Sequence, residues 1–297
     1  MYKSGFITII GRPNVGKSTL LNTIIGEKVA IVSDKAQTTR TRIRGVKHLP
    51  DAQMVFVDTP GVQNPQNRLG EYMQKVTWSS FDGVEALVVM FHGGEGLRKR
   101  DEEIIDSLVN MKELPAVFAV VNFMDHAPPQ RVVPLLARLG EVKEFQAVYP
   151  ISALTGEGVE TLLDALLEAL PEGPQYFPED QFTDQPERTL IAELIRESAL
   201  ERLKEEVPHG LGVEIQAMEQ RQNGQLEIHA TIYCEKESHK GILIGKKGQM
   251  LKDIGSAARQ EIQRLLASPV HLELWIKVKE NWRNSGSMLQ TLGYIQD

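Results

Sequence analysis

Apolar runs and helical patterns alternate along the first 171 residues of the chain. Several runs are almost continuously apolar, which is typical of strands buried on both faces. The segments between them repeat apolar residues at helical spacing. This alternation predicts an α/β domain with a mostly parallel sheet and helices on both faces. The expected strands are Phe6–Ile10, Arg42–Lys47, Met54–Val57, Ala86–Phe91, Ala116–Val121 and Ala147–Ile151, and the expected helices are Lys17–Ile25, Lys99–Met111, Gln130–Leu139 and Val159–Leu170.

The pattern changes at Pro171–Pro178, which holds three prolines and a glycine. Neither a helix nor a central strand tolerates that composition. We therefore expect a first domain at residues 1–171, a linker at 172–186 and a second domain at 187–297.

The second domain is expected to begin with an amphipathic helix from Glu187 to Glu206. Two strands joined at Asn223-Gly224, a favoured hairpin dipeptide, come next. A last strand, Val270–Lys279, alternates so that Trp275 falls on the outer face, where it is covered or contacts a partner. With a helix before that strand, the order α-β-β-α-β predicts a small α+β domain.

Composition restricts the class of protein. The single cysteine, Cys234, excludes an internal disulfide framework and suits a reducing cytosol. The sequence begins directly with a predicted strand, so we expect no signal peptide, and no apolar run has the length of a membrane span. The net charge of −7 argues against nucleic acid, but residues 236–264 hold seven Lys and Arg against three acids. A local basic face is therefore compatible with phosphate contacts.

The first predicted strand and helix are joined by a G-x-x-x-x-G-K-S loop. Its glycines let consecutive N–H groups point at one anion, and the helix N-terminus adds partial positive charge. Lys17 would reach the β- and γ-phosphates of a nucleoside triphosphate, and Ser18 would ligate Mg²⁺. The nucleotide-binding residues expected here are Gly11, Arg12, Pro13, Asn14, Val15, Gly16, Lys17, Ser18 and Thr19.

Three further motifs follow later strands, at the sheet edge where ligands of parallel sheets bind. The carboxylate of Asp58 can hold Mg²⁺ through water, and the Gly61 N–H can meet a γ-phosphate. A threonine of segment 33–40 should close over the metal in the triphosphate state; we prefer Thr39 but keep Thr38 as an alternative. The motifs are Asp58-Thr59-Pro60-Gly61 with Val62 after it, Asn122-Phe123-Met124-Asp125, and Ser152-Ala153-Leu154.

A G-x-x-G loop lies between an apolar segment and a helix in the second domain. Such a loop clamps the RNA backbone in KH domains, where its glycines allow close approach and its lysines neutralise phosphate. Ile242 and Ile244 would either line a groove for bases or fill the core. The expected RNA-binding residues are Lys240, Ile242, Ile244, Gly245, Lys246, Lys247, Gly248 and Lys252.

The order of these motifs resembles the G domain of translation-factor-class GTPases. Together with the segment A-Q-T-T-R, the proline-rich linker and the G-x-x-G loop, it is similar to the bacterial Era GTPase family over nearly the whole chain. The resemblance implies that Asp125 selects guanine, that Asn122 braces the loop and meets the base, and that the Ala153 N–H meets the guanine O6. It also implies Mg²⁺ ligation by Ser18, Thr39 and Asp58, with Lys17, Thr39, Gly61 and Asn14 as the catalytic set.

Two residues depart from the pattern. Phe123 stands where the family has a lysine over the nucleotide, so it brings a ring but no charge. Val62 stands where Ras-type GTPases have the glutamine that orients water, so hydrolysis should be slow without another source of charge. In related loops an asparagine at the position of Asn14 helps to hold K⁺; shaping the loop is the alternative role.

The resemblance implies a GTPase that binds GTP and GDP and the 3′ end of small-subunit ribosomal RNA during assembly of that subunit. It further implies a cytoplasmic monomer with peripheral contact with the inner membrane, although no amphipathic basic helix demands that contact. Two other functions stay open: an RNA-binding chaperone gated by nucleotide with little turnover, and a GTPase whose second domain binds protein.

Overall fold

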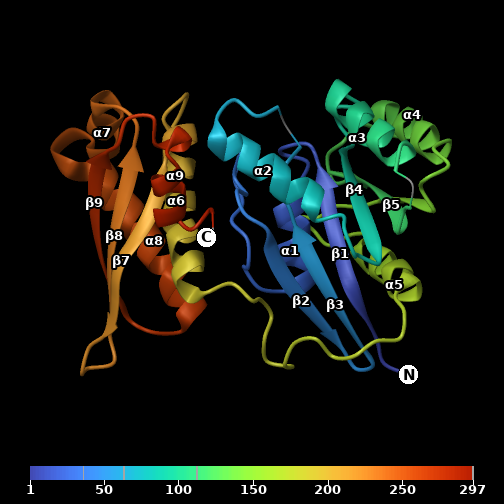
Figure 1. The fold of residues 1–297 in the computed structure, drawn as a ribbon, viewed down its shortest axis with the longest axis horizontal. Coiled ribbons are helices and arrows are strands. Elements are labelled where there is room, and N and C mark those ends of the chain that lie inside the picture. Colours follow the sequence, from blue (N-terminus) through green and yellow to red (C-terminus); the bar gives the residue numbers. More distant parts are fainter. Residues whose placement is uncertain (36, 63, 112, 296–297) are drawn as a thin grey trace. The chain divides into compact units, whose positions relative to one another are not determined.

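A computed structural model describes residues 1–35, 37–62, 64–111 and 113–295 of the chain (Figure 1). These residues form two compact units, each made of more than one stretch of chain. The first unit contains residues 1–30, 39–64 and 73–184, and the second contains 31–38, 65–72 and 185–297. We call segment 33–40, which is expected to close over the metal, the predicted first switch; its Ala36 lies outside the described residues.

A six-stranded sheet organises the first unit. Its strand order is β2-β3-β1-β4-β5-β6. Strands β1, β3, β4, β5 and β6 run parallel, whereas β2 is antiparallel to β3. The mostly parallel sheet predicted from the apolar runs is therefore confirmed. The strands are β1 (Lys3–Gly11), β2 (Ile43–Leu49), β3 (Ala52–Asp58), β4 (Ala86–His92), β5 (Ala116–Asn122) and β6 (Ala147–Pro150).

Helices cover both faces of this sheet, as the sequence predicted. Successive residues of β1 point to opposite faces, so Ile9 packs with α1 and α5 while Ile10 packs in a cluster with α3 and α4. The helices are α1 (Lys17–Ile25), α2 (Arg68–Ser79), α3 (Lys99–Val109), α4 (Pro129–Gly140) and α5 (Val159–Ala169).

Helix α2 is not among the helices expected from the sequence. Segment 59–81 contains Pro60, Gly61, Asn64, Pro65 and Asn67, which together favour a mobile loop. Those residues all precede Arg68, where the helix begins. The helix forms because three buried side chains, spaced four residues apart, lie on one face of it: Leu69, Met73 and Thr77.

The proline-rich segment after α5 is fixed to the first unit by its backbone. Lys3 forms a β-bridge with Glu172, and Gly45 forms one with Thr183. Between these bridges, the Gln53 side-chain oxygen accepts from the N–H groups of Tyr176 and Phe177 at 2.8 and 3.0 Å. Residues 172–184 therefore run along the first unit instead of crossing solvent freely.

The second unit packs helices against one face of a three-stranded sheet with the order β7-β8-β9. Strand β8 is antiparallel to β7 and parallel to β9. The expected hairpin is confirmed, because the Gly224 N–H donates to the Arg221 carbonyl at 2.9 Å. The elements are α6 (Glu187–Arg202), β7 (Gly212–Gln220), β8 (Leu226–Cys234), α7 (Glu237–Ile244), α8 (Gln249–Leu266), β9 (Val270–Val278) and α9 (Gly286–Thr291), with 3-10 turns at Pro208–Gly210, Lys246–Gly248 and Trp282–Asn284.

Three elements of this unit differ from the prediction. The apolar segment before the G-x-x-G loop is a helix, α7, and a further helix, α9, follows β9, so the order is α-β-β-α-α-β-α. Helix α6 ends at Arg202 rather than Glu206, because Leu203 takes an extended backbone and Glu205 has a φ of 55°. Among the described residues, no helix is both long and apolar enough to cross a membrane.

Trp282 anchors the C-terminal segment of the second unit. Its side chain is fully buried, stacks on Tyr294, and donates from Nε1 to the Gly210 carbonyl at 2.8 Å. We expect Trp282→Ala to lower the free energy of unfolding by about 3–5 kcal/mol, the usual cost of emptying a buried aromatic site. Urea unfolding followed by circular dichroism measures it.

Trp275→Ala serves as the matched control, since that ring is 42% exposed. We expect it to cost less than about 1 kcal/mol. Equal losses from the two tryptophans would contradict the anchoring role of Trp282.

Candidate functional site

The glycine-rich loop joins the end of β1 to the start of α1. Gly16 has a φ of 95°, and a side chain there would collide with the Asn122 amide, so only glycine fits. Lys17 is buried and donates from Nζ to the carbonyls of Gly11 and Arg12 at 3.3 and 3.2 Å. Burial lowers the pKa of the Lys17 ammonium, an effect that the Asp58 carboxylate opposes. The lysine therefore lies over the loop that would hold the phosphates.

Ser18, Thr39 and Asp58 meet at the edge of this loop. Asp58 Oδ2 accepts from Ser18 Oγ at 2.7 Å and from Thr39 Oγ1 at 3.2 Å, and the two hydroxyls are 3.0 Å apart. Asp58 is fully buried, and its Oδ1 has no hydrogen-bond partner within the part of the chain that the structure describes. Burial raises the pKa of the Asp58 carboxyl, while Lys17 lowers it. Two hydroxyls and a buried carboxylate oxygen without a partner fit a hard divalent cation such as Mg²⁺.

The structure distinguishes the two threonines left open by the sequence. Thr38 donates from its hydroxyl to the Lys35 carbonyl at 2.6 Å, so its side chain closes a local turn. Thr39 is the buried one whose hydroxyl joins Ser18 and Asp58. Thr39 is therefore the better candidate for the metal ligand.

The segment after β3 packs on the glycine-rich loop. The Val62 N–H donates to the Gly11 carbonyl at 3.1 Å, and the Val62 side chain is buried in the apolar cluster that includes Ile10. Thr59 donates to the Ile9 carbonyl at 2.9 Å, and the Pro60 carbonyl accepts from Thr77 at the same distance. Valine at this position therefore stabilises the fold and presents no polar group to a water molecule.

Asn14 has a φ of 63° and an exposed side chain. Asparagine tolerates this left-handed backbone better than most residues. The geometry thus accounts for Asn14 as a loop-shaping residue and leaves its side chain accessible to an ion.

Arg12 forms an ion-pair network that the sequence did not indicate. Its Nε lies 3.2 Å from Asp101 Oδ2, and its Nη2 pairs with Glu95. Asp101 is fully buried, and burial raises the pKa of its carboxyl while the Arg98 N–H and Arg12 lower it. The network fixes the glycine-rich loop to the start of α3, so Arg12 positions this loop.

The Asn122 side chain links the two loops that would hold the base. It donates from Nδ2 to the Val15 carbonyl at 2.9 Å and accepts at Oδ1 from the Ala153 N–H at 2.8 Å. The N–H expected to meet guanine O6 is therefore engaged by Asn122, and a base would have to share it. Ser152 and Ala153 are buried, whereas Leu154 is exposed at the rim.

Asp125 already has a partner. Its Oδ2 lies 2.9 Å from His126 Nδ1, and this hydrogen bond, followed by one from Ser152, lowers the pKa of the Asp125 carboxyl. The neighbouring Met124 donates its N–H to the Ile151 carbonyl at 3.1 Å, which fixes the loop. Asp125 is held as a carboxylate, the form that accepts hydrogen bonds from guanine N1 and the exocyclic amine.

Phe123 packs against two histidines. Its ring centroid lies 4.2 Å from that of His92, with the planes tilted by 30°, and 5.3 Å from that of His126, which it meets edge-on at 61°. Burial lowers the pKa of the His92 imidazole, which favours its neutral form. Phe123 is therefore part of a cluster of three rings, and His92 was missed although it ends a parallel strand, where ligand-binding residues gather.

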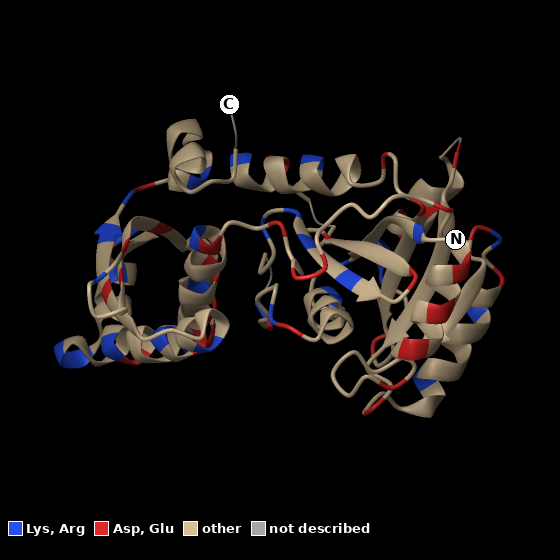
Figure 2. Ribbon diagram, turned by 90° about the horizontal axis from the view of Figure 1, so that it is seen from below, with Lys and Arg blue, Asp and Glu red and all other residues tan. Residues whose placement is uncertain are grey.

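The G-x-x-G loop forms a second candidate site. Gly245 has a φ of 69° and a ψ of 179°, a combination that is open almost only to glycine. Lys246 and Lys247 of the turn are both exposed. In Figure 2, Lys and Arg recur along the helical segments of this unit. The turn therefore offers exposed positive charge at the start of α8.

A groove of about 500 Å³ runs beside this loop, between α8 and the edge strand β9. Its polar lining includes Lys252, Arg259 and His271, and its apolar lining includes Leu251 and Leu274. Gly248, Gly255 and Ser256 also line it, which leaves room for a strand of nucleic acid. The spacing of Gly248, Lys252, Gly255 and Arg259 along one helix face could have been recognised in the sequence.

Ile242 and Ile244 were expected either to line a groove for bases or to fill the core, and their exposure excludes the core alternative. They are 48% and 37% exposed on α7, and the residue that this helix buries is Leu243. Neither isoleucine lines the groove beside α8. Lys240 precedes them on α7 and is also outside that lining.

Comparisons with known protein families match both halves of the chain. Residues 6–123 match a family described as 50S ribosome-binding GTPase. Residues 206–283 match the KH domain.

Full-length relatives carry both regions. The chain is 49% identical to the GTPase Era of Ruminiclostridium cellulolyticum over 99% of this chain and 98% of the relative. It is 50% identical to the GTPase Era of Alkaliphilus metalliredigens over 99% of both chains.

Two crystal structures match the whole fold. One is an Era variant from Aquifex aeolicus bound to GDP and AlF4−, with a TM-score of 0.94 and 42% identity, covering 99% of this chain and 100% of that one. The other is an Era in complex with MgGDPNP and nucleotides 1506–1542 of 16S ribosomal RNA, with a TM-score of 0.95 and 41% identity over the full length of both chains.

The ring cluster at Phe123 generates a prediction about nucleotide affinity. We expect Phe123→Ala to weaken GDP binding about 10-fold, or about 1.4 kcal/mol, because the loss removes the aromatic cover. We expect Phe123→Lys to bind at least as tightly as the unmodified chain, since a lysine stem can cover the same face. Titration with a fluorescent GDP derivative measures both.

Phe182→Ala is the matched control, because that ring is 41% exposed and lies on the segment after the first sheet. We expect no change from it. Unaltered GDP affinity in Phe123→Ala would show that the ring cluster serves the fold alone.

Proposed function

The chain belongs to the Era family of GTPases, and from that membership we propose that it couples GTP hydrolysis to binding the 3′ end of small-subunit ribosomal RNA during assembly of that subunit. The observation that carries the proposal is the meeting of Ser18, Thr39 and Asp58 beside the glycine-rich loop, in a chain that also has a KH groove. Full-length similarity to an Era crystallised with MgGDPNP and 16S ribosomal RNA supports both parts of the proposal, the nucleotide site and the RNA site.

The phosphates are held by the glycine-rich loop, and the base is held by the loop after β5. The N–H groups of the glycine-rich loop and the Lys17 ammonium face the β- and γ-phosphates. Asp125 accepts from guanine N1 and the exocyclic amine, which adenine could not offer. His126 must yield its hydrogen bond with Asp125 when guanine binds, and Phe123 covers the base face.

Ser18, Thr39 and Asp58 would hold Mg²⁺, which neutralises charge on the β- and γ-phosphate oxygens when it is bound. Thr39 belongs to a segment that closes in the triphosphate state and is released once the γ-phosphate has gone. With the ion bound, the Ser18 and Thr39 hydroxyls would contact it instead of Asp58.

Hydrolysis consists of in-line attack of water on the γ-phosphorus, with cleavage of the bond to the β–γ bridging oxygen. Lys17 stabilises the charge that develops on the leaving oxygen, and the Gly61 N–H meets the γ-phosphate. Val62 supplies no polar group, so the intrinsic rate is slow. We propose that the exposed Asn14 side chain helps to hold K⁺, which supplies the missing positive charge.

The predicted first switch is joined to the RNA-binding unit by direct contacts. Residues 31–38 belong to the second unit, where the Val32 N–H donates to Glu197 Oε1 at 2.8 Å and the Arg196 guanidinium donates to the Thr38 carbonyl. Both charged side chains are buried in α6. Because Thr38 directly precedes Thr39, a movement of Thr39 would also move the Thr38 carbonyl that Arg196 of α6 contacts. This connection supports the proposal that the bound nucleotide governs RNA binding.

RNA binds in the groove between α8 and β9. Lys246, Lys247, Lys252 and Arg259 neutralise phosphates, while the apolar lining accepts bases. Because the partner is the small ribosomal subunit, we place the chain in the cytoplasm as a monomer. Peripheral contact with the inner membrane remains an implication of family resemblance alone.

The K⁺ proposal predicts a dependence on the monovalent cation. We expect replacement of K⁺ by Na⁺ to slow multiple-turnover phosphate release at least about 10-fold, since one charge that stabilises the transition state is lost. Asn14→Ala should be slow in both salts. Phosphate release with a coupled colorimetric assay measures the rates, with and without the ribosomal RNA fragment.

Equal rates in K⁺ and Na⁺ would leave Asn14 as a loop-shaping residue. No multiple turnover under any condition would favour the nucleotide-gated chaperone, a role that the apolar side chain of Val62 suggests.

The KH groove predicts RNA affinity that depends on the G-x-x-G loop. We expect Gly245→Asp with Gly248→Asp to abolish binding of the ribosomal 3′-end RNA, because side chains block the close approach and add negative charge. Lys246→Glu with Lys247→Glu should lower the slope of log affinity against log salt by about 1.4, as expected for two lost phosphate contacts on single-stranded RNA. Filter binding with a GTP analogue and with GDP measures both.

Lys277→Glu is the control, since this exposed lysine on β9 does not line the groove. GTP affinity should stay unchanged in every variant. Full RNA affinity after both pairs of substitutions would contradict the KH assignment and favour a protein-binding second unit.

A further inference from the structure

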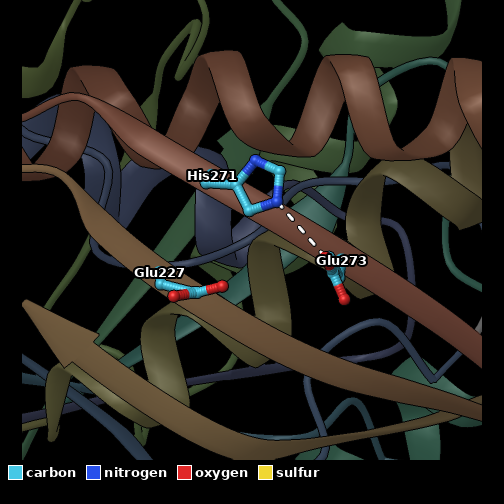
Figure 3. Close-up of side chains that lie close together, drawn as sticks. All are labelled: Glu227, His271 and Glu273. Atoms are coloured by element: carbon cyan, nitrogen blue, oxygen red, sulfur yellow. Dashed lines mark hydrogen bonds and ion pairs between the residues drawn. The ribbon is translucent and has the colours of Figure 1, made fainter. Parts of the chain in front are cut away.

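The outer face of the three-stranded sheet carries a cluster of two histidines and two glutamates. Glu227 and His229 lie on β8, and His271 and Glu273 lie on β9. The parallel register places Glu227 opposite His271 and His229 opposite Glu273. We refer to these four residues as the outer-face cluster. Figure 3 draws three of its members, which come from neighbouring strands.

Three side chains of this cluster converge at ligand distances. One ligand atom each from Glu227, His271 and Glu273 lies within 4.8 Å of the other two. The closest pair, His271 Nε2 and Glu273 Oε1, is 3.4 Å apart (Figure 3). Two ligands of a tetrahedral zinc ion with bonds of about 2.0–2.1 Å are separated by roughly the same distance.

We propose that Glu227, His271 and Glu273 form a binding site for a divalent transition-metal ion such as Zn²⁺. An imidazole nitrogen with two carboxylate oxygens is a donor set that borderline metal ions accept. The side chains are 20% to 45% exposed, so the ion can enter and water can complete its coordination. The site lies on the sheet of the KH domain, more than 200 residues along the sequence from the glycine-rich loop. Metal binding at this site does not depend on the function proposed above.

The negative charge of the two glutamates favours a cation, but Arg221 competes with that cation for Glu227. Arg221 holds Glu227 with two hydrogen bonds, Nε to Oε2 at 2.7 Å and Nη2 to Oε1 at 2.5 Å. These bonds lower the pKa of Glu227 to about 2 and keep it a carboxylate. An incoming ion must therefore displace Arg221 from at least one oxygen, which lowers the apparent affinity.

His229 acts as a positioning residue. It lies between the two carboxylates, with Nε2 at 3.2 Å from Glu227 and Nδ1 at 3.6 Å from Glu273. Its ring also stacks on Trp275, with centroids 5.4 Å apart. Partners of this kind hold carboxylate ligands in place, and their loss commonly weakens metal binding by about 10- to 100-fold.

The test is calorimetric titration of the full chain, saturated with GDP and Mg²⁺, with Zn²⁺. Co²⁺ titration followed by visible absorption reports whether imidazole nitrogen joins the coordination sphere. We expect one Zn²⁺ per chain, and we expect His271→Gln and Glu273→Gln each to weaken binding at least 10-fold. Arg221→Gln should tighten binding, because it removes the competitor for Glu227.

Two control variants separate this site from other donors. His209→Gln removes a histidine outside the cluster, and Cys234→Ser removes the single thiol, which is buried. Neither should change the uptake of zinc. Circular dichroism of each variant verifies the fold.

The proposal is overturned if the unmodified chain takes up no stoichiometric Zn²⁺, or if His271→Gln and Glu273→Gln bind it as the unmodified chain does. Failure of Arg221→Gln to tighten binding would also contradict it, and this exposed substitution carries little risk of misfolding.

Discussion

The hydrogen bonds that reach the buried carboxylate of Asp58 are the interaction on which the first unit depends. Asp58 ends β3 and receives hydroxyl groups from the start of α1 and from the predicted first switch. A buried carboxylate is stable only when its environment supplies hydrogen bonds or positive charge. Ser18, Thr39 and the nearby Lys17 supply these, and in doing so they bring three separate stretches of chain to one point. These contacts reach Asp58 Oδ2 and leave Oδ1 without a partner among the described residues, which is why we propose the same three side chains as the ligands of a metal ion.

Much of this could be predicted from sequence because the signals are local. Apolar runs indicated each strand, and motifs directly after β1, β3, β5 and β6 were expected at one sheet edge because parallel strands end there. Among the described residues, three helices were not predicted: α2, α7 and the short α9. Helix α2 was hidden because Pro60 to Asn67 suggested a loop, although the buried face begins just after them. Helix α7 was hidden because its run of Ile242 to Ile244 suggested an apolar core segment, while only Leu243 is buried.

Contacts between distant residues could not be predicted in the same way. Arg12 meets Asp101 across 89 positions, and nothing in either segment alone indicates the pair. The contact of His92 with Phe123 likewise depends on the parallel pairing of β4 with β5, which sets His92 beside Asn122. The sequence showed that Phe123 departs from the family pattern. Only the strand register showed that His92 lies beside it. Burial lowers the pKa of His92 and so favours its neutral imidazole beside Phe123.

The segment after α5 stays bonded to the first unit almost as far as the start of α6. Residues 172–184 are bonded along β1, β2 and β3, so the backbone that is not held by either unit is short. The first unit ends at Asp184 and α6 begins at Glu187, a distance of three peptide steps. Such a stretch reaches about 10 Å at most. The backbone that leaves the first unit after Asp184 is therefore a short tether and not a long flexible linker.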